Sequence, residues 1–206
     1  MLDRFALALL KPSLETAAAA LVRRGVGADA VTLTGLALGL AAAAAVSQHA
    51  FAAGLLLLAA NRIADGLDGP VARIVGATDR GAFLDITSDF LVYASIPLAF
   101  ALADPAGNAL AAATLLAAFI GTGSSFLAFA VMAQRRGLTS AAYPDKGFYY
   151  LGGLTEGTET VVCFMAMCLW PPHFAAIACA FAALCGLTLV ARLVAGWRLL
   201  GTPQLP

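Results

Sequence analysis

Long apolar stretches alternate with short polar connections along nearly the whole chain. Six of them are candidates for membrane-spanning helices, because about 20 mostly apolar residues in a helix cross the hydrocarbon core of a bilayer. They run from Ala30 to Ser47, Phe51 to Arg73, Gly81 to Leu102, Ala109 to Met132, Thr158 to Trp170 and Phe174 to Val194. The fifth is the shortest and begins with polar residues. The pattern predicts an all-α integral membrane protein with six transmembrane helices.

The segment before the first span, Met1 to Arg24, mixes charged residues with apolar ones. This mixture favours an amphipathic helix that lies on the membrane surface and would break at Pro12. A signal peptide is the alternative reading. However, Asp3, Arg4 and Lys11 interrupt any apolar run of useful length.

The composition agrees with a membrane protein. The 206 residues are 61% hydrophobic and 12% charged, and the mean hydropathy is +0.88. Because the spans cover nearly the whole chain, we expect residues 1–206 to form a single transmembrane domain. Within the first span, Gly35 and Gly39 form a pair of small residues four apart, which predicts close helix packing.

Lysine and arginine gather on one side of this predicted topology. Those outside the spans are Arg4, Lys11, Arg23, Arg24, Arg80, Arg135, Arg136, Lys146 and Arg198. The connections on the opposite side contain no Lys or Arg. The positive-inside rule therefore places both termini of this multi-pass protein at the cytoplasmic side.

Four aspartates lie in residues 61–90 of this mostly apolar chain. Asp65 and Asp68 are three residues apart and Asp85 and Asp89 are four apart, so each pair lies on one face of a helix. If residues 74–80 form the connection, the two helices run antiparallel and the pairs lie at matched depths. The four carboxylates are then expected to converge near the cytoplasmic side.

Carboxylates that converge in an apolar environment repel one another and need cations to neutralise them. The available ligands are hard oxygens, with no Cys or His nearby. Such ligands suit Mg²⁺, Mn²⁺ or Ca²⁺ better than Zn²⁺. Two ions about 3.5 to 4 Å apart would fit between the pairs.

Glycines adjoin the acidic face. Gly66, Gly69 and Gly81 allow a bulky ligand to approach the backbone closely. Arg73 adds a positive charge beside them. The expected metal ions, the room for a ligand beside the glycines and the flanking arginine together predict a site for a diphosphate.

The spacing of these residues resembles a known signature. The pattern Asp65-x-x-Asp68-Gly69-x-x-Ala72-Arg73, then Gly81-x-x-x-Asp85-x-x-x-Asp89, is similar to that of the CDP-alcohol phosphotransferase family of membrane enzymes. Eight positions at fixed spacing make this far more specific than a lone glycine motif.

The resemblance implies a role for each matching position. The expected metal ligands are Asp65, Asp68, Asp85 and Asp89, and Asp89 is also the expected general base. The residues expected to shape the nucleotide site are Gly69, Ala72, Arg73 and Gly81. Upstream, Ala28-Asp29-Ala30-Val31-Thr32 stands where many relatives have Pro-Asn-x-x-Thr. Of that upstream motif this chain keeps only the threonine, so Thr32 is a further candidate nucleotide-binding residue.

The implied activity is transfer of a phosphatidyl group from CDP-diacylglycerol to the hydroxyl of an alcohol, with release of CMP. The expected cofactor is Mg²⁺ or Mn²⁺, bound as two ions. The resemblance also implies a homodimer in a bacterial inner membrane, with the active site facing the cytoplasm. The expected partners are the two substrates and the lipid bilayer, and nucleic acid is not among them.

The acceptor alcohol is not identified by the sequence. The candidate acceptor-binding residues are Arg135, Arg136, Lys146, Glu156, Glu159 and Arg192. The three basic residues before the fifth span are either positive-inside anchors or contacts for a phosphate group. Glutamates at the start of that span could bind hydroxyl groups or an amine, which leaves a non-phosphorylated polyol or an amino alcohol open as the acceptor, and Arg192 could pair with one of the glutamates.

Two other classes of protein remain open at this point. Facing carboxylates inside a membrane also occur in cation transporters, although no polar trail continues below these aspartates in the sequence. A catalytically inactive protein that binds CDP-lipids is the second alternative. It is disfavoured because all four aspartates are present.

Overall fold

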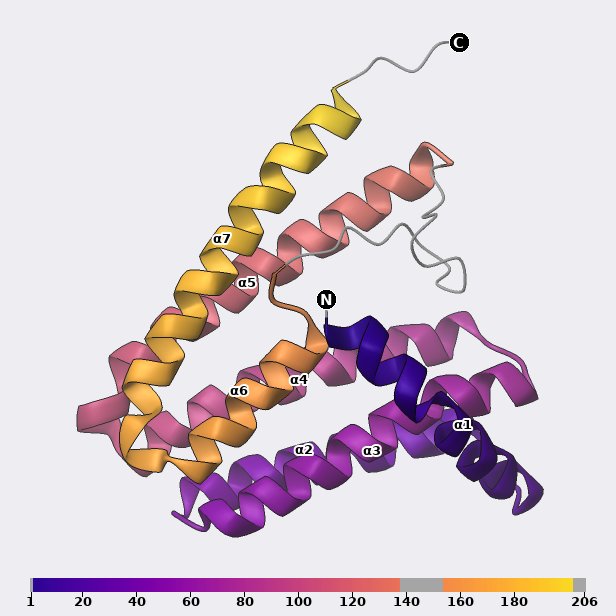
Figure 1. Cartoon of the computed structure of the whole chain (residues 1–206), viewed down its shortest axis with the longest axis horizontal. Coiled ribbons are helices and arrows are strands. Elements are labelled where there is room, and N and C mark those ends of the chain that lie inside the picture. Colours follow the sequence, from indigo (N-terminus) through magenta and orange to yellow (C-terminus); the bar gives the residue numbers. More distant parts are fainter. Residues whose placement is uncertain (1, 138–153, 202–206) are drawn as a thin grey trace.

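The computed structural model describes residues 2–137 and 154–201, and within these ranges it contains helices and no strand (Figure 1). In chain order the helices are α1 (Leu2–Arg23), α2 (Ala28–Ser47), α3 (Phe51–Val75), α4 (Asp79–Ala103), α5 (Pro105–Arg135), α6 (Gly157–Leu169), the short 3₁₀ helix η1 (Pro171–His173) and α7 (Phe174–Leu200). The predicted all-α architecture is confirmed.

Four described segments are long and apolar enough to cross a membrane: α2, α4, α5 and the continuous η1–α7 segment, Pro171–Leu200. The helix α3 has 25 residues but carries Arg62 near its middle and two aspartates in its second half. The helix α6 is apolar but has only 13 residues. The count of six membrane-crossing helices therefore stays a prediction.

The first helix, α1, is continuous through Pro12, so the break expected there is absent. It crosses the other helices at a steep angle in Figure 1 and packs on the second half of α3. Ala18 meets Val31 and Val71 in a small apolar cluster of its own. This contact places α1 beside the polar part of α3.

The main apolar core lies at the end of the bundle opposite to the aspartates. Phe100 stacks on Phe51, with ring centroids 5.6 Å apart, and on Phe174, with centroids 4.4 Å apart. These three rings join the end of α4 to the starts of α3 and α7. Away from this core, the pair α5 and α7 diverges from α2 and α3 (Figure 1).

The helix α2 packs tightly against both α3 and α4, whereas α3 and α4 make few direct contacts among the described residues. Gly39 makes this approach possible, because a Cβ atom there would overlap the Val92 side chain of α4 and lie 3.2 Å from Asn61 Nδ2 of α3. Val92 is 1% exposed and has a stiff β-branched side chain. The sequence-based expectation of close packing at this glycine is confirmed.

We therefore predict that Gly39→Ala destabilises the protein by about 1 to 3 kcal/mol, because the added methyl group overpacks a buried helix contact. The measurement is the thermal unfolding midpoint in detergent. Gly186→Ala is the matched control, since a Cβ atom at Gly186 meets nothing within 4 Å. It should leave the midpoint unchanged or raise it slightly through better helix propensity. Equal midpoints for both variants would contradict the prediction.

Candidate functional site

The aspartates are brought together by a short turn between α3 and α4. Gly76 ends α3 with a φ of 102°, a left-handed conformation that glycine adopts without strain. Thr78 begins α4 by accepting a hydrogen bond from Gly81 N at 3.0 Å. The connection is thus shorter than the predicted residues 74–80, and the chain reverses direction as expected.

Three of the four aspartates form a compact group. Asp65 and Asp68 from α3 and Asp85 from α4 each offer a carboxylate oxygen, and these oxygens all lie within 4.8 Å of one another. Asp68 is buried, with 7% of its surface exposed. These oxygens come from two helices, α3 and α4, that both pack on α2 and make few direct contacts with each other among the described residues.

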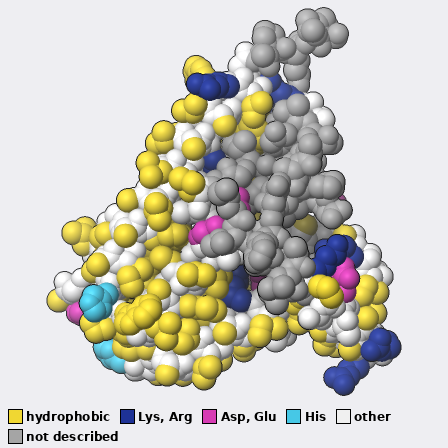
Figure 2. Space-filling model, in the orientation of Figure 1, with side chains coloured by type: hydrophobic (Ala, Val, Ile, Leu, Met, Phe, Trp, Pro, Cys, Tyr) yellow, Lys and Arg dark blue, Asp and Glu magenta, His cyan; other side chains and the backbone are white. Residues whose placement is uncertain are grey.

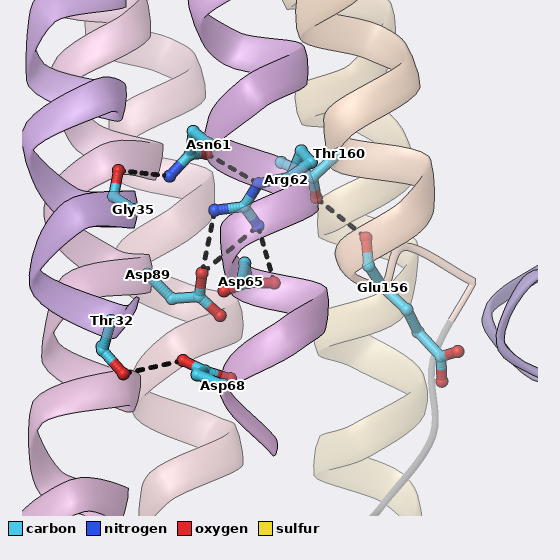
Figure 3. Close-up of polar contacts among 9 residues, drawn as sticks. All are labelled: Thr32, Gly35, Asn61, Arg62, Asp65, Asp68, Asp89, Glu156 and Thr160. Carbon is cyan, nitrogen blue, oxygen red and sulfur yellow. Dashed lines mark hydrogen bonds and ion pairs between the residues drawn. The ribbon is translucent and has the colours of Figure 1, made fainter. Parts of the chain in front are cut away.

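The fourth aspartate, Asp89, lies one turn further along α4 and is engaged by an arginine. Arg62 Nη2 lies 3.2 Å from Asp89 Oδ1, and Arg62 Nη1 lies 3.3 Å from the same oxygen. The Nη1 atom also lies 3.4 Å from Asp65 Oδ2. In Figure 3 the guanidinium of Arg62 stands between these two aspartates.

The helix α2 contributes a hydroxyl group to the cluster. Thr32 Oγ1 donates a hydrogen bond to Asp68 Oδ2 at 2.8 Å (Figure 3). Thr32 is itself 6% exposed, so the pair is shielded from water. Thr32, the threonine that this chain shares with the Pro-Asn-x-x-Thr motif of its relatives, is therefore in direct contact with the aspartate group.

Asn61 and Arg62 were given no site role from the sequence, yet both belong to this network. Asn61 Nδ2 donates to Gly35 O at 2.8 Å, and Arg62 Nε donates to Asn61 Oδ1 at 2.8 Å. Arg62 also lies over the Tyr93 ring, 5.7 Å from its centroid. The one available sequence signal was the three-residue spacing of Arg62 and Asp65, which puts them on one helix face.

A small pocket of about 10 Å³ opens among these side chains, which is about the volume that one water-sized group occupies. Ser88 lines it together with Asp65, Asp68 and Asp89. Ser88 is 7% exposed, and its Oγ atom has no hydrogen-bond partner within the described part of the chain. A buried hydroxyl of this kind normally has a partner, so the pocket is suited to a polar ligand.

The predicted nucleotide residues other than Thr32 lie at the end of α3 and the start of α4. A Cβ atom on Gly69 would meet only the Arg73 side chain, at 3.6 Å, and Arg73 is exposed while Ala72 is half-buried. Gly81 is more confined, because a Cβ there would lie 3.3 Å from Asp29 Oδ1. Asp29 also forms an ion pair with Arg80, in which Arg80 Nη2 lies 2.6 Å from Asp29 Oδ2.

The predicted acceptor residues are dispersed, and several serve helix ends. Glu156 and Glu159 form a reciprocal capping box at the start of α6, and the Glu156 side chain extends away from the aspartates in Figure 3. Arg136 donates to Leu200 O at 2.6 Å. Arg135 is exposed in the last turn of α5.

The remaining two acceptor candidates are Arg192 and Lys146. Arg192 is 7% exposed and donates from Nη1 to Thr122 O of α5 at 3.0 Å. Its guanidinium also lies over the Phe126 ring. Lys146 falls outside the described residues.

The donor set fits a hard divalent cation. Three carboxylates and a nearby hydroxyl supply oxygen ligands only, which Mg²⁺, Mn²⁺ and Ca²⁺ prefer. The described cysteines lie in α6 and α7, away from this group. The arrangement could therefore hold a metal ion beside a carboxylate, Asp89, that Arg62 orients.

Comparison with known proteins identifies the family. The model of the CDP-alcohol phosphatidyltransferase family matches residues 26–188. The chain is 47% identical over 204 residues to the inner membrane protein YnjF of Escherichia coli strain K12, covering 99% of both chains. It is 41% identical over 105 residues to a phosphatidylinositol phosphate synthase of Streptomyces avermitilis, covering 50% of this chain and 43% of the relative.

Solved structures show the same fold. The phosphatidylinositol phosphate synthase PgsA1 of Mycobacterium tuberculosis, solved with CDP-DAG bound, superposes with a TM-score of 0.72 at 22% identity, covering 89% of this chain and 93% of the other. Its complex with manganese and citrate gives a TM-score of 0.71 at 22% identity, covering 89% and 88%. The resemblance drawn from the motif is thus confirmed over most of the chain, and the protein belongs to the CDP-alcohol phosphatidyltransferase family.

Proposed function

We propose that this protein transfers the phosphatidyl group of CDP-diacylglycerol to the hydroxyl group of an alcohol and releases CMP. The observation that carries the proposal is the group of three carboxylates within 4.8 Å in a chain of this family. Support also comes from the relatives, since the M. tuberculosis synthase was solved with CDP-DAG and with manganese.

Asp65, Asp68 and Asp85 would hold the divalent cation, Mg²⁺ or Mn²⁺. A cation at this position supplies neutralising charge for a diphosphate and for the departing CMP. Thr32 keeps the Asp68 carboxylate in place through the 2.8 Å hydrogen bond. Fixed ligands of this kind lower the cost of assembling the site when substrate arrives.

Asp89 is the proposed general base. Its Oδ1 atom accepts from Arg62, which orients the carboxylate that would accept the proton of the acceptor hydroxyl. The deprotonated oxygen then attacks the phosphorus that carries the diacylglycerol. A new phosphorus–oxygen bond forms, the bond to the CMP oxygen breaks, and CMP leaves with the electron pair.

We further propose that the site faces the cytoplasm. The basic residues Arg73 and Arg80 lie at the same ends of α3 and α4 as the aspartates, whereas His49 and His173 lie at the opposite ends of the helices. On the face shown in Figure 2, the histidines and the Lys and Arg side chains occupy separate regions. This distribution follows the positive-inside rule, and E. coli YnjF is an inner membrane protein.

The test of the proposed function is CMP release by the purified protein in detergent with CDP-diacylglycerol and Mg²⁺. The acceptor panel contains glycerol 3-phosphate, inositol phosphate, inositol, serine and phosphatidylglycerol. CMP that appears with one acceptor establishes the reaction and identifies its product. Absence of both CMP release and CDP-diacylglycerol binding would contradict the proposal.

We predict that Asp89→Asn lowers kcat by about 10²- to 10⁴-fold, because the amide cannot accept the acceptor proton. The measurement is CMP release at saturating substrate, with CDP-diacylglycerol binding measured in parallel. Asp104→Asn is the control: Asp104 caps α5 by accepting from Gly107 N, and Asn caps equally well. Comparable rates for Asp89→Asn and the control would remove Asp89 as the base.

We also predict that Thr32→Val weakens Mn²⁺ binding by about 10- to 100-fold, as loss of a group that orients a metal ligand typically does. Valine keeps the shape of threonine but cannot donate to Asp68. Thr32→Ser keeps the hydroxyl and should bind Mn²⁺ nearly as well as the original protein. Titration of chelator-treated protein with Mn²⁺ measures both, and equal affinities for the two variants would refute the prediction.

A further inference from the structure

Asn61 is a buried polar side chain at the contact between α2 and α3. It is 2% exposed, and its Nδ2 atom would lie 3.2 Å from a Cβ atom at Gly39. Nδ2 donates to Gly35 O of α2 at 2.8 Å, and Oδ1 accepts from Arg62 Nε at 2.8 Å (Figure 3). Because a buried polar group without a partner is costly, the use of both ends stabilises the amide in this place.

The two bonds require an amide at position 61. Gly35 O is an acceptor and needs a donor, whereas Arg62 Nε only donates and needs an acceptor. An amide offers both groups on one short side chain, while an ionised carboxylate offers acceptors only and an aliphatic side chain offers neither. Asn61 therefore links the guanidinium of Arg62 to the backbone of α2.

The bond at Nε decides where Arg62 points. The guanidinium is planar, so a partner at Nε fixes the direction of both terminal nitrogens. In this orientation Nη2 lies 3.2 Å from Asp89 Oδ1, and Nη1 lies 3.4 Å from Asp65 Oδ2. Asp65 is three residues away on the same helix, where neighbouring side chains meet by helix geometry alone. Asp89 belongs to α4, so the contact with Asp89 is the one that depends on the bond to Asn61.

A similar bond between an asparagine amide and a backbone carbonyl lies at the opposite end of the bundle. Asn108 Nδ2 of α5 donates to Phe100 O of α4 at 3.0 Å. Like the bond from Asn61 to Gly35, it joins two helices. The difference is that Asn61 also bonds to Arg62, which contacts an aspartate of the site. Asn108 therefore offers a control for the purely structural part of such a bond.

We propose that Asn61 is a positioning residue for the transfer reaction, because through Arg62 it sets the place of the Asp89 carboxylate. This inference rests on the proposed function, in which Asp89 takes the proton of the acceptor hydroxyl. The two side-chain bonds of Asn61 go to Gly35 and Arg62, not to the residues proposed to hold the cation or the nucleotide. Loss of the link should therefore slow the chemical step and leave donor binding intact.

Asn61→Leu tests the proposal, since leucine has a similar shape but neither donates nor accepts. We expect kcat for CMP release to fall about 10²-fold, because a displacement of about 1 Å in the site can cost that much. The KM for CDP-diacylglycerol should not change. Asn108→Leu is the matched control and should alter neither constant. Asn61→Ala is the second variant if Asn61→Leu does not fold, and an unchanged kcat in a folded Asn61 variant would overturn the inference.

A double-mutant cycle tests whether the effect passes through Arg62. Arg62→Gln alone should lower kcat, and adding Asn61→Leu to it should lower kcat no further. Independent losses of packing would instead multiply, because the free-energy effects of independent changes add. A double variant that loses the product of the two single effects would overturn the inference.

The unfolding midpoint in detergent allows a second cycle that needs no substrate. Asn61 and Asp89 both bond to Arg62, so the effects of Asn61→Leu and Asp89→Asn on the midpoint should not be additive. Non-additive midpoints support the inference even where no acceptor of the panel releases CMP, a result that counts against the proposed function alone. Additive midpoints would overturn the inference while leaving the proposed function in place.

Discussion

The structure depends on one electrostatic constraint, which is that carboxylates among apolar helices need compensating charge and hydrogen-bond donors. Asp68 meets this need through Thr32 of α2, and Asp89 meets it through Arg62 of α3. Asp65, Asp68 and Asp85, whose carboxylate oxygens lie within 4.8 Å of one another, form the group suited to a cation. The helices α2, α3 and α4 are therefore joined at the site by polar contacts as well as by apolar packing.

Close packing of α2 makes these polar contacts possible. At Gly39 the absence of a side chain admits Val92 from α4 and Asn61 from α3. At Gly35 the backbone carbonyl accepts from Asn61, and a Cβ atom would lie 3.4 Å from that of Ala64. Small residues thus bring the α2 backbone within hydrogen-bond distance of α3. The same helix delivers Thr32 to the cluster.

The structure also changes how the charged residues near α6 are interpreted. Glutamates at a membrane edge suggested a site for the acceptor, but Glu156 and Glu159 satisfy the first amide groups of α6. Helix ends leave such groups without partners inside the helix, so the capping box accounts for both glutamates without a ligand. Arg136 similarly satisfies backbone carbonyls at the end of α7. Neither contact selects among acceptor alcohols.

The sequence by itself determined the helical membrane class, the two pairs of aspartates and the family, because hydropathy and fixed spacing are properties of the chain that need no partner. It placed Asp65 and Asp68 on one face, and Asp85 and Asp89 on another, from helix periodicity alone. Only the tertiary structure decided which carboxylates meet. Asp89 turns to Arg62, Asn61 bonds to α2, and α3 stands apart from α4. The pair Gly35 and Gly39 predicts that α2 packs closely on a neighbour, but which helices pack there is decided by contacts between distant segments of the chain, which a local sequence pattern does not specify.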